Sequence, residues 1–296
     1  MNTSLPDLLR RERPVLLDGA TGTELERRGF SLQASGWSAR AIDDAPDLLE
    51  QIHRDYVDAG AVIVTANTFR LHRRNLADWG RQDDQRRLVQ QAILLARSAS
   101  AGRALVAGSL APLGDCYSPA DMPAGGRVES EHGELAGELA RAGADVILVE
   151  TMVAGVEAEA ACSAAAATGL PYIVSFVTGP DGRLLSGELL NDVLPRVLPH
   201  GPAVVGVNCV TCRHVPGAIE MLVGKAGTTS VGVYADTGER ADDGSWRVTT
   251  ASQPAVYAGI ASGWLDRGIQ LVGGCCGTTP EHIAALQELI SQRFPL

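Results

Sequence analysis

The sequence has few cysteines, no excess of positive charge and no long apolar run. Six cysteines in 296 residues are too sparse for a scaffold held together by disulfides. The formal net charge of −10 argues against a nucleic-acid-binding surface. Two arginine-rich patches, at 10–13 and 70–74, are interrupted by other residues, so we expect both to be solvated faces.

Signals for membranes and export are also missing. No stretch approaches the length of a membrane-spanning helix. The segment Met1–Arg13 is polar and charged, without the apolar core of a signal peptide. We therefore expect a cytoplasmic protein with reduced thiols, which binds neither membranes nor nucleic acid.

Short apolar runs recur along the chain, with helical patterns between them. We predict eight strands, at Val15–Leu17, Ala61–Ala66, Ala104–Ala107, Asp145–Val149, Tyr172–Val177, Val204–Asn208, Val231–Tyr234 and Ile269–Val272. None alternates as a half-solvated sheet does, which indicates a parallel sheet covered on its faces. Eight such units in this length favour a closed (β/α)8 barrel, and the lack of a linker predicts one domain over residues 1–296.

The segment 273–281 reads Gly-Gly-Cys-Cys-Gly-Thr-Thr-Pro-Glu and lies where a strand pattern changes into a helix. Neighbouring side chains of a regular strand point to opposite faces, so Cys275 and Cys276 share one spot only if the backbone turns there. The flanking glycines permit that turn. Thr279 is predicted to be the N-cap, with Pro280 at the first helical position. The positive end of that helix is expected to favour thiolates.

Cys209 is a candidate third ligand, because it also follows an apolar strand pattern. Three sulfurs at two strand ends can bind zinc and leave its fourth position open, as in catalytic zinc sites. Two alternatives remain at this point. The cysteines could be buried apolar side chains, or Cys212, which forms a C-x-x-C pair with Cys209, could complete a closed structural site.

Further polar residues fall at or just after the C-terminal ends of the predicted strands. They are Asp18, Asn67, Thr68, Ser109, Glu150, Ser175 and Asn208. In a barrel these ends form one face, and active sites lie there. Strands six and eight are separated by one strand, so Cys209 can approach the cysteine pair.

Four motifs stand in a fixed order along the chain. They are Asp18-Gly19-Ala20-Thr21-Gly22-Thr23-Glu24-Leu25, Asn67-Thr68-Phe69, Val207-Asn208-Cys209 and Gly273-Gly274-Cys275-Cys276-Gly277-Thr278-Thr279-Pro280. This set resembles the homocysteine S-methyltransferase family over essentially the whole chain. The resemblance implies a (β/α)8 barrel with zinc on Cys209, Cys275 and Cys276. It also implies a methyltransferase of methionine biosynthesis, in which homocysteine binds zinc through sulfur and accepts the methyl group.

The amino-acid end of homocysteine requires an anion near its ammonium group and donors near its carboxylate. Glu150, which matches the family's strand-four glutamate, is expected to bind the ammonium, and Asp18 is the second candidate. Loop capping is the alternative role for both acids. Backbone amides at Gly19 and Ala20 are expected to hold the carboxylate, and Asn208 is expected to orient the zinc-bearing loop.

Thr68 and Ser109 complete the substrate-binding candidates, although their hydroxyls could instead bond to the backbone. Family members that use sulfonium donors often carry Tyr-Pro-Asn-Ser-Gly-Glu after strand seven. This chain has Tyr-Ala-Asp-Thr-Gly-Glu at 234–239. Asp236 in place of asparagine therefore alters the expected contacts on the donor side.

The leading hypothesis is zinc-dependent methyl transfer from S-adenosylmethionine or S-methylmethionine to homocysteine, giving methionine. Zinc deprotonates a bound thiol, so no separate general base is required. In alternative hypotheses the enzyme takes the methyl group from betaine or from a corrinoid on a partner protein. The acceptor could also be a selenol or another thiol. A hypothesis from a different functional class is a zinc-binding or thiol-redox protein without methyl transfer, in which Cys275 and Cys276 form a reversible disulfide.

Overall fold

The structure, a computed structural model, describes residues 3–123, 126–241 and 245–295. Its strands are β1 (Val15–Leu16), β2 (Ile63–Ala66), β3 (Leu105–Leu110), β4 (Val146–Met152), β5 (Tyr172–Phe176), β6 (Val204–Thr211), β7 (Ser230–Asp236), β8 (Gly238–Arg240), β9 (Trp246–Val248) and β10 (Leu271–Gly274). Its α-helices are α1 (Leu5–Leu9), α2 (Gly22–Arg27), α3 (Ala41–Asp44), α4 (Pro46–Asp58), α5 (Arg73–Ala77), α6 (Gln85–Ser100), α7 (Arg127–Arg141), α8 (Gly155–Ala167), α9 (Leu190–Val197), α10 (Val215–Lys225), α11 (Pro254–Leu265) and α12 (Pro280–Arg293).

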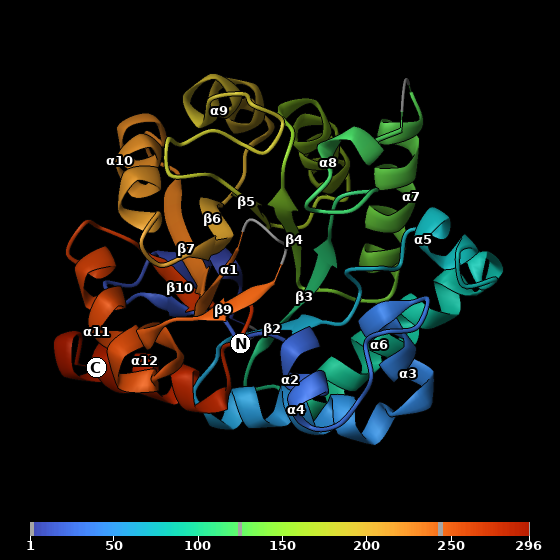
Figure 1. The fold of residues 1–296 in the computed structure, drawn as a ribbon, viewed down its shortest axis with the longest axis horizontal. Coiled ribbons are helices and arrows are strands. Elements are labelled where there is room, and N and C mark those ends of the chain that lie inside the picture. The colour runs from blue at the N-terminus through green and yellow to red at the C-terminus, as the bar shows by residue number, and fades with distance from the viewer. Residues whose placement is uncertain (1–2, 124–125, 242–244, 296) are drawn as a thin grey trace.

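Eight of the strands form one parallel sheet, in the order β1-β10-β7-β6-β5-β4-β3-β2. A parallel bridge between Leu17 and Ile63 joins the two edge strands, so the sheet closes on itself. Helices surround this ring of strands (Figure 1). The prediction of a (β/α)8 barrel with eight strands is confirmed.

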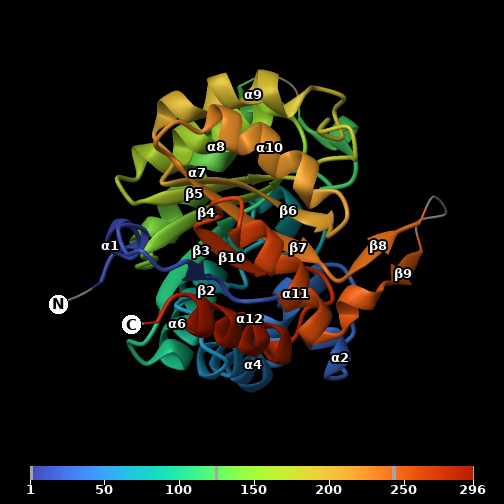
Figure 2. The ribbon, with the colours of Figure 1, turned by 90° about the vertical axis from the view of Figure 1, so that its left-hand side faces the viewer.

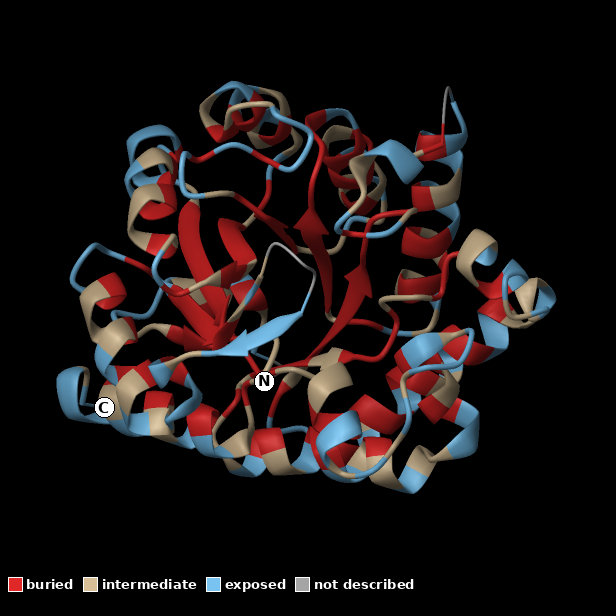
Figure 3. Cartoon of the chain, in the orientation of Figure 1, coloured by how far each residue is buried: buried red, intermediate tan, exposed pale blue. Residues whose placement is uncertain are grey.

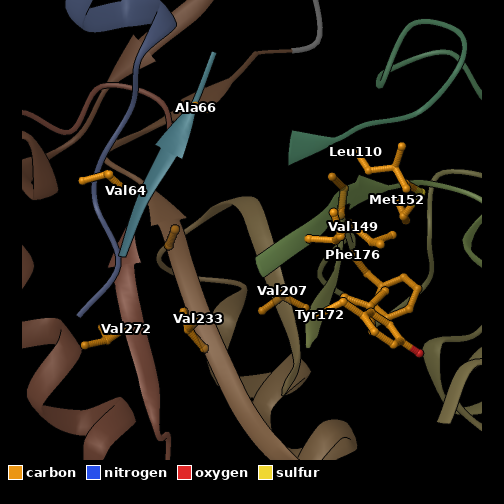
Figure 4. Packing of buried hydrophobic residues seen from close by; sticks show 14 of the residues in the cluster. Val64, Ala66, Leu110, Val149, Met152, Tyr172, Phe176, Val207, Val233 and Val272 are labelled. Atoms are coloured by element: carbon orange, nitrogen blue, oxygen red, sulfur yellow. The ribbon is translucent and has the colours of Figure 1, made fainter. Parts of the chain in front are cut away.

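Alternation along the strands separates two apolar cores. Val15 and Leu17 point into the barrel, whereas Leu16 points out toward the helices. The outer core includes strand residues such as Val64 and Val207, which are drawn in Figure 4. Figure 3 shows the consequence, since the strands of the barrel are buried and exposed residues lie mainly on the outer helices, on the loops and on β9.

The two ends of the barrel differ. At one end α1 contributes Leu5 and Leu8 to the inner core. Figure 2 shows α1 and the antiparallel hairpin of β8 and β9 on opposite sides of the barrel. The open end for a ligand is therefore the C-terminal end of the strands, beside the hairpin. Within the described residues, no helix combines the length and apolarity needed to cross a membrane.

Two details differ from the sequence-based prediction. The hairpin of β8 and β9, which follows β7, is not among the eight predicted strands. Several strands also run further than predicted, so Ser109, Glu150 and Cys209 lie within the last residues of β3, β4 and β6. Apolar patterning misses these residues because the strand continues beyond its last apolar side chain.

Gly206 keeps β6, the strand that carries Cys209, close to β7. A Cβ atom on Gly206 would lie 2.3 Å from the carbonyl oxygen of Gly232 in the neighbouring strand. Gly206→Ala is therefore expected to lower the free energy of unfolding by about 1–3 kcal/mol or more. Gly217→Ala on α10 is the control, since its Cβ would meet nothing within 4 Å, and it should add about 0.4–1 kcal/mol. Chemical denaturation compares the two, and equal stabilities would contradict this packing argument.

Candidate active site

Three cysteines meet at the C-terminal end of the barrel. The Sγ atoms of Cys209 and Cys276 lie 3.7 Å apart. Together with Cys275 Sγ and a carboxylate oxygen of Asp236, they form a cluster whose atoms all lie within 4.8 Å of one another. Residues 209, 236 and 275–276 come from β6, from β7 and from the turn after β10, and β7 pairs with both other strands. The topology thus brings together side chains far apart in sequence.

The end of β6 departs from regular strand geometry to aim Cys209. Its φ is +54°, in a region that residues other than glycine rarely adopt, and the register with β7 shifts there. Thr151 on β4 has φ +65° at a similar shift. Asn208 supports both distortions, since its Oδ1 accepts from Thr151 N at 2.9 Å and its Nδ2 donates to Thr151 Oγ1 at 2.9 Å. Such strain persists only where surrounding contacts enforce it.

The turn after β10 has the predicted form. Gly277 has φ +81°, and α12 begins with Thr279 as N-cap and Pro280 in its first turn. The amide of Cys276 donates to Asp236 Oδ1 at 2.9 Å, which fixes the carboxylate against the turn. Thr278 Oγ1 donates to the carbonyl of Cys275 at 2.7 Å. The prediction of a glycine-permitted turn capped by Thr279 is confirmed.

The thiols do not ionise readily in this setting. Hydrogen bonding with Cys275, with burial adding to it, raises the pKa of Cys209 well above its ordinary value. Hydrogen bonding with Cys209, again with burial, does the same to the pKa of Cys276. Without a metal, hydrogen bonding among the thiols and burial thus outweigh the stabilisation of thiolates that is expected from the helix N-terminus. A bound cation would reverse the balance.

The donor set and spacing fit zinc. Zinc–sulfur bonds of about 2.3 Å in a tetrahedron place the sulfurs about 3.8 Å apart, close to the 3.7 Å between Cys209 and Cys276. All three cysteines are free, whereas a disulfide would require a sulfur separation near ~2.05 Å. Cys212 donates its thiol to the carbonyl of Asp236 at 3.3 Å instead of joining the cluster. The fourth member of the cluster is thus the carboxylate of Asp236, which the sequence did not single out as a ligand.

A cavity of ≈ 310 Å³ opens beside the cluster. The predicted site residues that line it are Asp18, Gly19, Ala20, Ser109, Glu150, Cys209, Cys275 and Cys276. Thr68 and Asn208 lie behind its wall. The hydroxyl of Thr68 donates to the carbonyl of Ser109 at 2.9 Å, so it bonds the backbone as the alternative reading held. Asn208 Nδ2 faces Cys275 Sγ at 3.9 Å.

Two buried acids form the polar part of the cavity. Burial raises the pKa of Glu150 to about 7, with the nearby charge of Asp18 adding to the effect, while hydrogen bonding from Ser109 lowers it. Burial also raises the pKa of Asp18 to about 7. Thr65 N and Thr65 Oγ1 donate to Asp18 at 2.6 and 2.9 Å. In the described residues neither acid has a basic ion-pair partner, so both are suited to a cationic ligand group.

Several residues that line the cavity were not among the predicted site residues, although Phe69 belongs to one of the four motifs. Trp37, Phe69 and Tyr117 present aromatic rings, and the hydroxyl of Tyr117 lies 3.6 Å from Cys209 Sγ. Tyr117 comes from the proline-containing loop after β3, which offers no periodic pattern to identify this residue. Arg70 also lines the cavity, so the expectation that the whole 70–74 patch is a solvated face is wrong.

Comparisons with known proteins agree with this geometry. A family model described as homocysteine S-methyltransferase matches residues 15–290. The homocysteine S-methyltransferase of Escherichia coli (strain K12) is 33% identical, over 97% of this chain and 98% of that protein. The selenocysteine Se-methyltransferase of Brassica oleracea var. italica is 27% identical, over 94% and 90% of the two chains. The metallated form of the homocysteine methyltransferase MmuM from Escherichia coli superposes with a TM-score of 0.83 and 29% identity, covering 96% of this chain and 99% of that one.

Proposed function

Since the chain belongs to the homocysteine S-methyltransferase family, we propose that it uses a sulfonium donor, S-adenosylmethionine or S-methylmethionine, and Zn²⁺ held by Cys209, Cys275 and Cys276. The product would be methionine. The observation that carries this proposal is the cluster of three sulfurs and one carboxylate in the wall of a cavity. The metallated form of a similar enzyme supports it.

Zinc bound there would keep the sulfur of homocysteine deprotonated, as a thiolate, at neutral pH. The chain's own part is to fix the ligands. Asn208 holds the backbone that aims Cys209, and the amide of Cys276 holds the carboxylate of Asp236. Asp236 would hold the metal as a fourth, oxygen ligand beside the three sulfurs.

The remaining cavity residues would position the amino acid. The ammonium group of homocysteine fits the buried carboxylates of Glu150 and Asp18, which form no ion pair with a basic side chain among the described residues. The amide of Ala20 already donates to Thr278 Oγ1 at 3.2 Å, so the substrate carboxylate would rely mainly on the amide of Gly19.

The cavity suits transfer from a positively charged donor. The homocysteine thiolate would attack the methyl carbon, the carbon–sulfonium bond would break, and two neutral thioethers would result. Because opposite charges meet and disappear, a cavity that excludes water favours the step. The aromatic face of Trp37 also attracts a cation, whereas Arg70 already lies over the ring of Phe69 and Arg240 over that of Tyr117.

A selenol is a second candidate acceptor. The relative from Brassica oleracea is a selenocysteine Se-methyltransferase, and it aligns along nearly the whole chain. A selenolate could occupy the same position as the homocysteine sulfur. A competition assay with equal concentrations of homocysteine and selenocysteine would rank the two acceptors.

One assay tests the proposal. Purified protein with bound zinc is incubated with homocysteine and, in separate reactions, with S-adenosylmethionine, S-methylmethionine or betaine, and methionine is measured. We expect methionine from at least one of the two sulfonium donors. Methionine from betaine alone, or thiol–disulfide exchange without any methionine, would contradict the proposal.

Asp236→Asn tests the role of the carboxylate in the cluster. Asparagine keeps an oxygen at this position but removes the negative charge, so we expect zinc binding to weaken at least about tenfold, which is the lower end of the cost of losing even a supporting group at a metal site. Competition with a chromophoric chelator measures the affinity. Glu239→Gln is the control, because Glu239 pairs with Arg213 and Arg247 and lies outside the cluster. Equal zinc affinities for wild type and Asp236→Asn would contradict the assignment.

A further inference from the structure

Arg70 is a positively charged residue in the wall of the cavity, and it forms no ion pair with any other described residue. It lies four residues beyond the end of β2 and lines the cavity. Its Nε is buried without a hydrogen-bond partner. The guanidinium has one long contact, from Nη1 to the carbonyl of Gly114 at 3.5 Å. Among the described residues no acid pairs with it, in contrast to Arg73 and Arg74 in the same patch.

An unpartnered guanidinium in a cavity calls for an anionic ligand group. A buried donor without an acceptor is unfavourable, so a ligand group that accepts a hydrogen bond from this Nε removes that cost. The planar fork of arginine matches the two oxygens of a carboxylate. Phe69 lies under the guanidinium, 5.8 Å from its centre, which helps to fix its plane.

The position of Arg70 relates it to the methyl donor. Its contact at Gly114 and its charge effect on Cys116 place it beside the loop after β3. The same loop carries Tyr117, whose hydroxyl touches the sulfur of Cys209. A donor with its methyl group near that sulfur can extend along this loop to Arg70. The acids that suit the ammonium group of homocysteine are Glu150 on β4 and Asp18, which follows Leu17 and accepts hydrogen bonds from Thr65 of β2.

We propose that Arg70 binds the carboxylate of the methyl donor, so that the donor is a cation that also carries an amino-acid carboxylate. This inference rests on the proposed function and extends it. A cavity of ≈ 310 Å³ is at the lower end of the range of about 300–1,000 Å³ for ligand sites, which favours a compact donor such as S-methylmethionine.

The test compares Arg70→Gln with wild type on two donors, S-methylmethionine and its carboxamide, which lacks the negative charge. With S-methylmethionine we expect KM to rise at least about tenfold in the variant, as loss of a hydrogen bond to a charged group implies. With the carboxamide the KM of variant and wild type should agree, and the KM for homocysteine should not change. Arg73→Gln is the matched control, since Arg73 is exposed and pairs with Asp83.

The outcomes separate this inference from the proposed function. If wild type makes methionine from homocysteine and S-methylmethionine but Arg70→Gln leaves the donor KM unchanged, the inference is wrong and the function stands. If only the KM for homocysteine rises, Arg70 binds the acceptor carboxylate and the inference is also wrong. If wild type makes no methionine with any donor, both fall. An unchanged melting temperature of the variant shows that any loss is not caused by unfolding.

Discussion

Replacing Cys209 with serine is expected to abolish methyl transfer and to remove the metal. A serine hydroxyl is a far poorer zinc ligand than a thiolate, and only two sulfurs would remain at the site. Since loss of a supporting group alone costs about 10–100-fold in metal affinity, loss of a direct ligand should cost more than about 100-fold. Elemental analysis after dialysis should find about one zinc per chain in wild type and almost none in Cys209→Ser.

The matched control is Cys212→Ala. Cys212 lies three residues further along the chain, but its thiol bonds to the carbonyl of Asp236 outside the cluster. We expect this variant to keep its zinc and its activity. Loss of zinc in Cys212→Ala as complete as in Cys209→Ser would indicate the closed four-sulfur site and contradict the catalytic reading.

Glu150→Gln is expected to weaken binding of the amino acid while leaving the metal in place. The carboxylate of Glu150 lines the cavity but is not a member of the sulfur cluster. Losing a charged partner for the ammonium group should raise the Kd at least about tenfold at pH 8. Calorimetric titration with methionine, the expected product, measures this without interference from a thiol. Zinc content should match that of wild type, and exposed Glu129→Gln should behave as wild type.

The same titration has an expected pH dependence. Burial raises the pKa of Glu150 to about 7, so below that pH a proton must leave before an ammonium group can bind. Affinity for methionine should therefore rise with pH up to about 7 and then level off, by up to about tenfold per pH unit. In Glu150→Gln this slope should be reduced. A wild-type affinity that is flat between pH 5.5 and 8.5, or that falls as pH rises, would refute this role for Glu150.

Apolar periodicity and strand count were sufficient to predict the barrel. Short buried strands leave a strong signal, because each needs a continuous apolar run between turns. The turn around Cys275 and Cys276 was predictable for a similar reason, since glycine, threonine and proline occupy positions with specific backbone demands. The C-terminal bounds of the strands were harder to predict. Residues 109, 150 and 209 still belong to β3, β4 and β6, but they line the cavity and do not continue the apolar pattern.

The missed residues share a physical cause. Asp236 ends β7, which lies between β6 and β10, but the predicted strand order alone does not show that its carboxylate meets the sulfurs. Tyr117 reaches Cys209 from an irregular loop that has no period to analyse. Arg70 stands among surface arginines, and only burial of its Nε distinguishes it from them. Tertiary contacts, not local pattern, decide all three.

X-ray absorption at the zinc edge tests the central claim most directly, with the zinc-loaded protein measured before and after homocysteine is added. The account predicts three sulfur ligands and one oxygen ligand without substrate, and four sulfurs, at about 2.3 Å, with substrate. Four sulfur ligands already present without homocysteine, or a coordination shell that does not change when homocysteine is added, would contradict it.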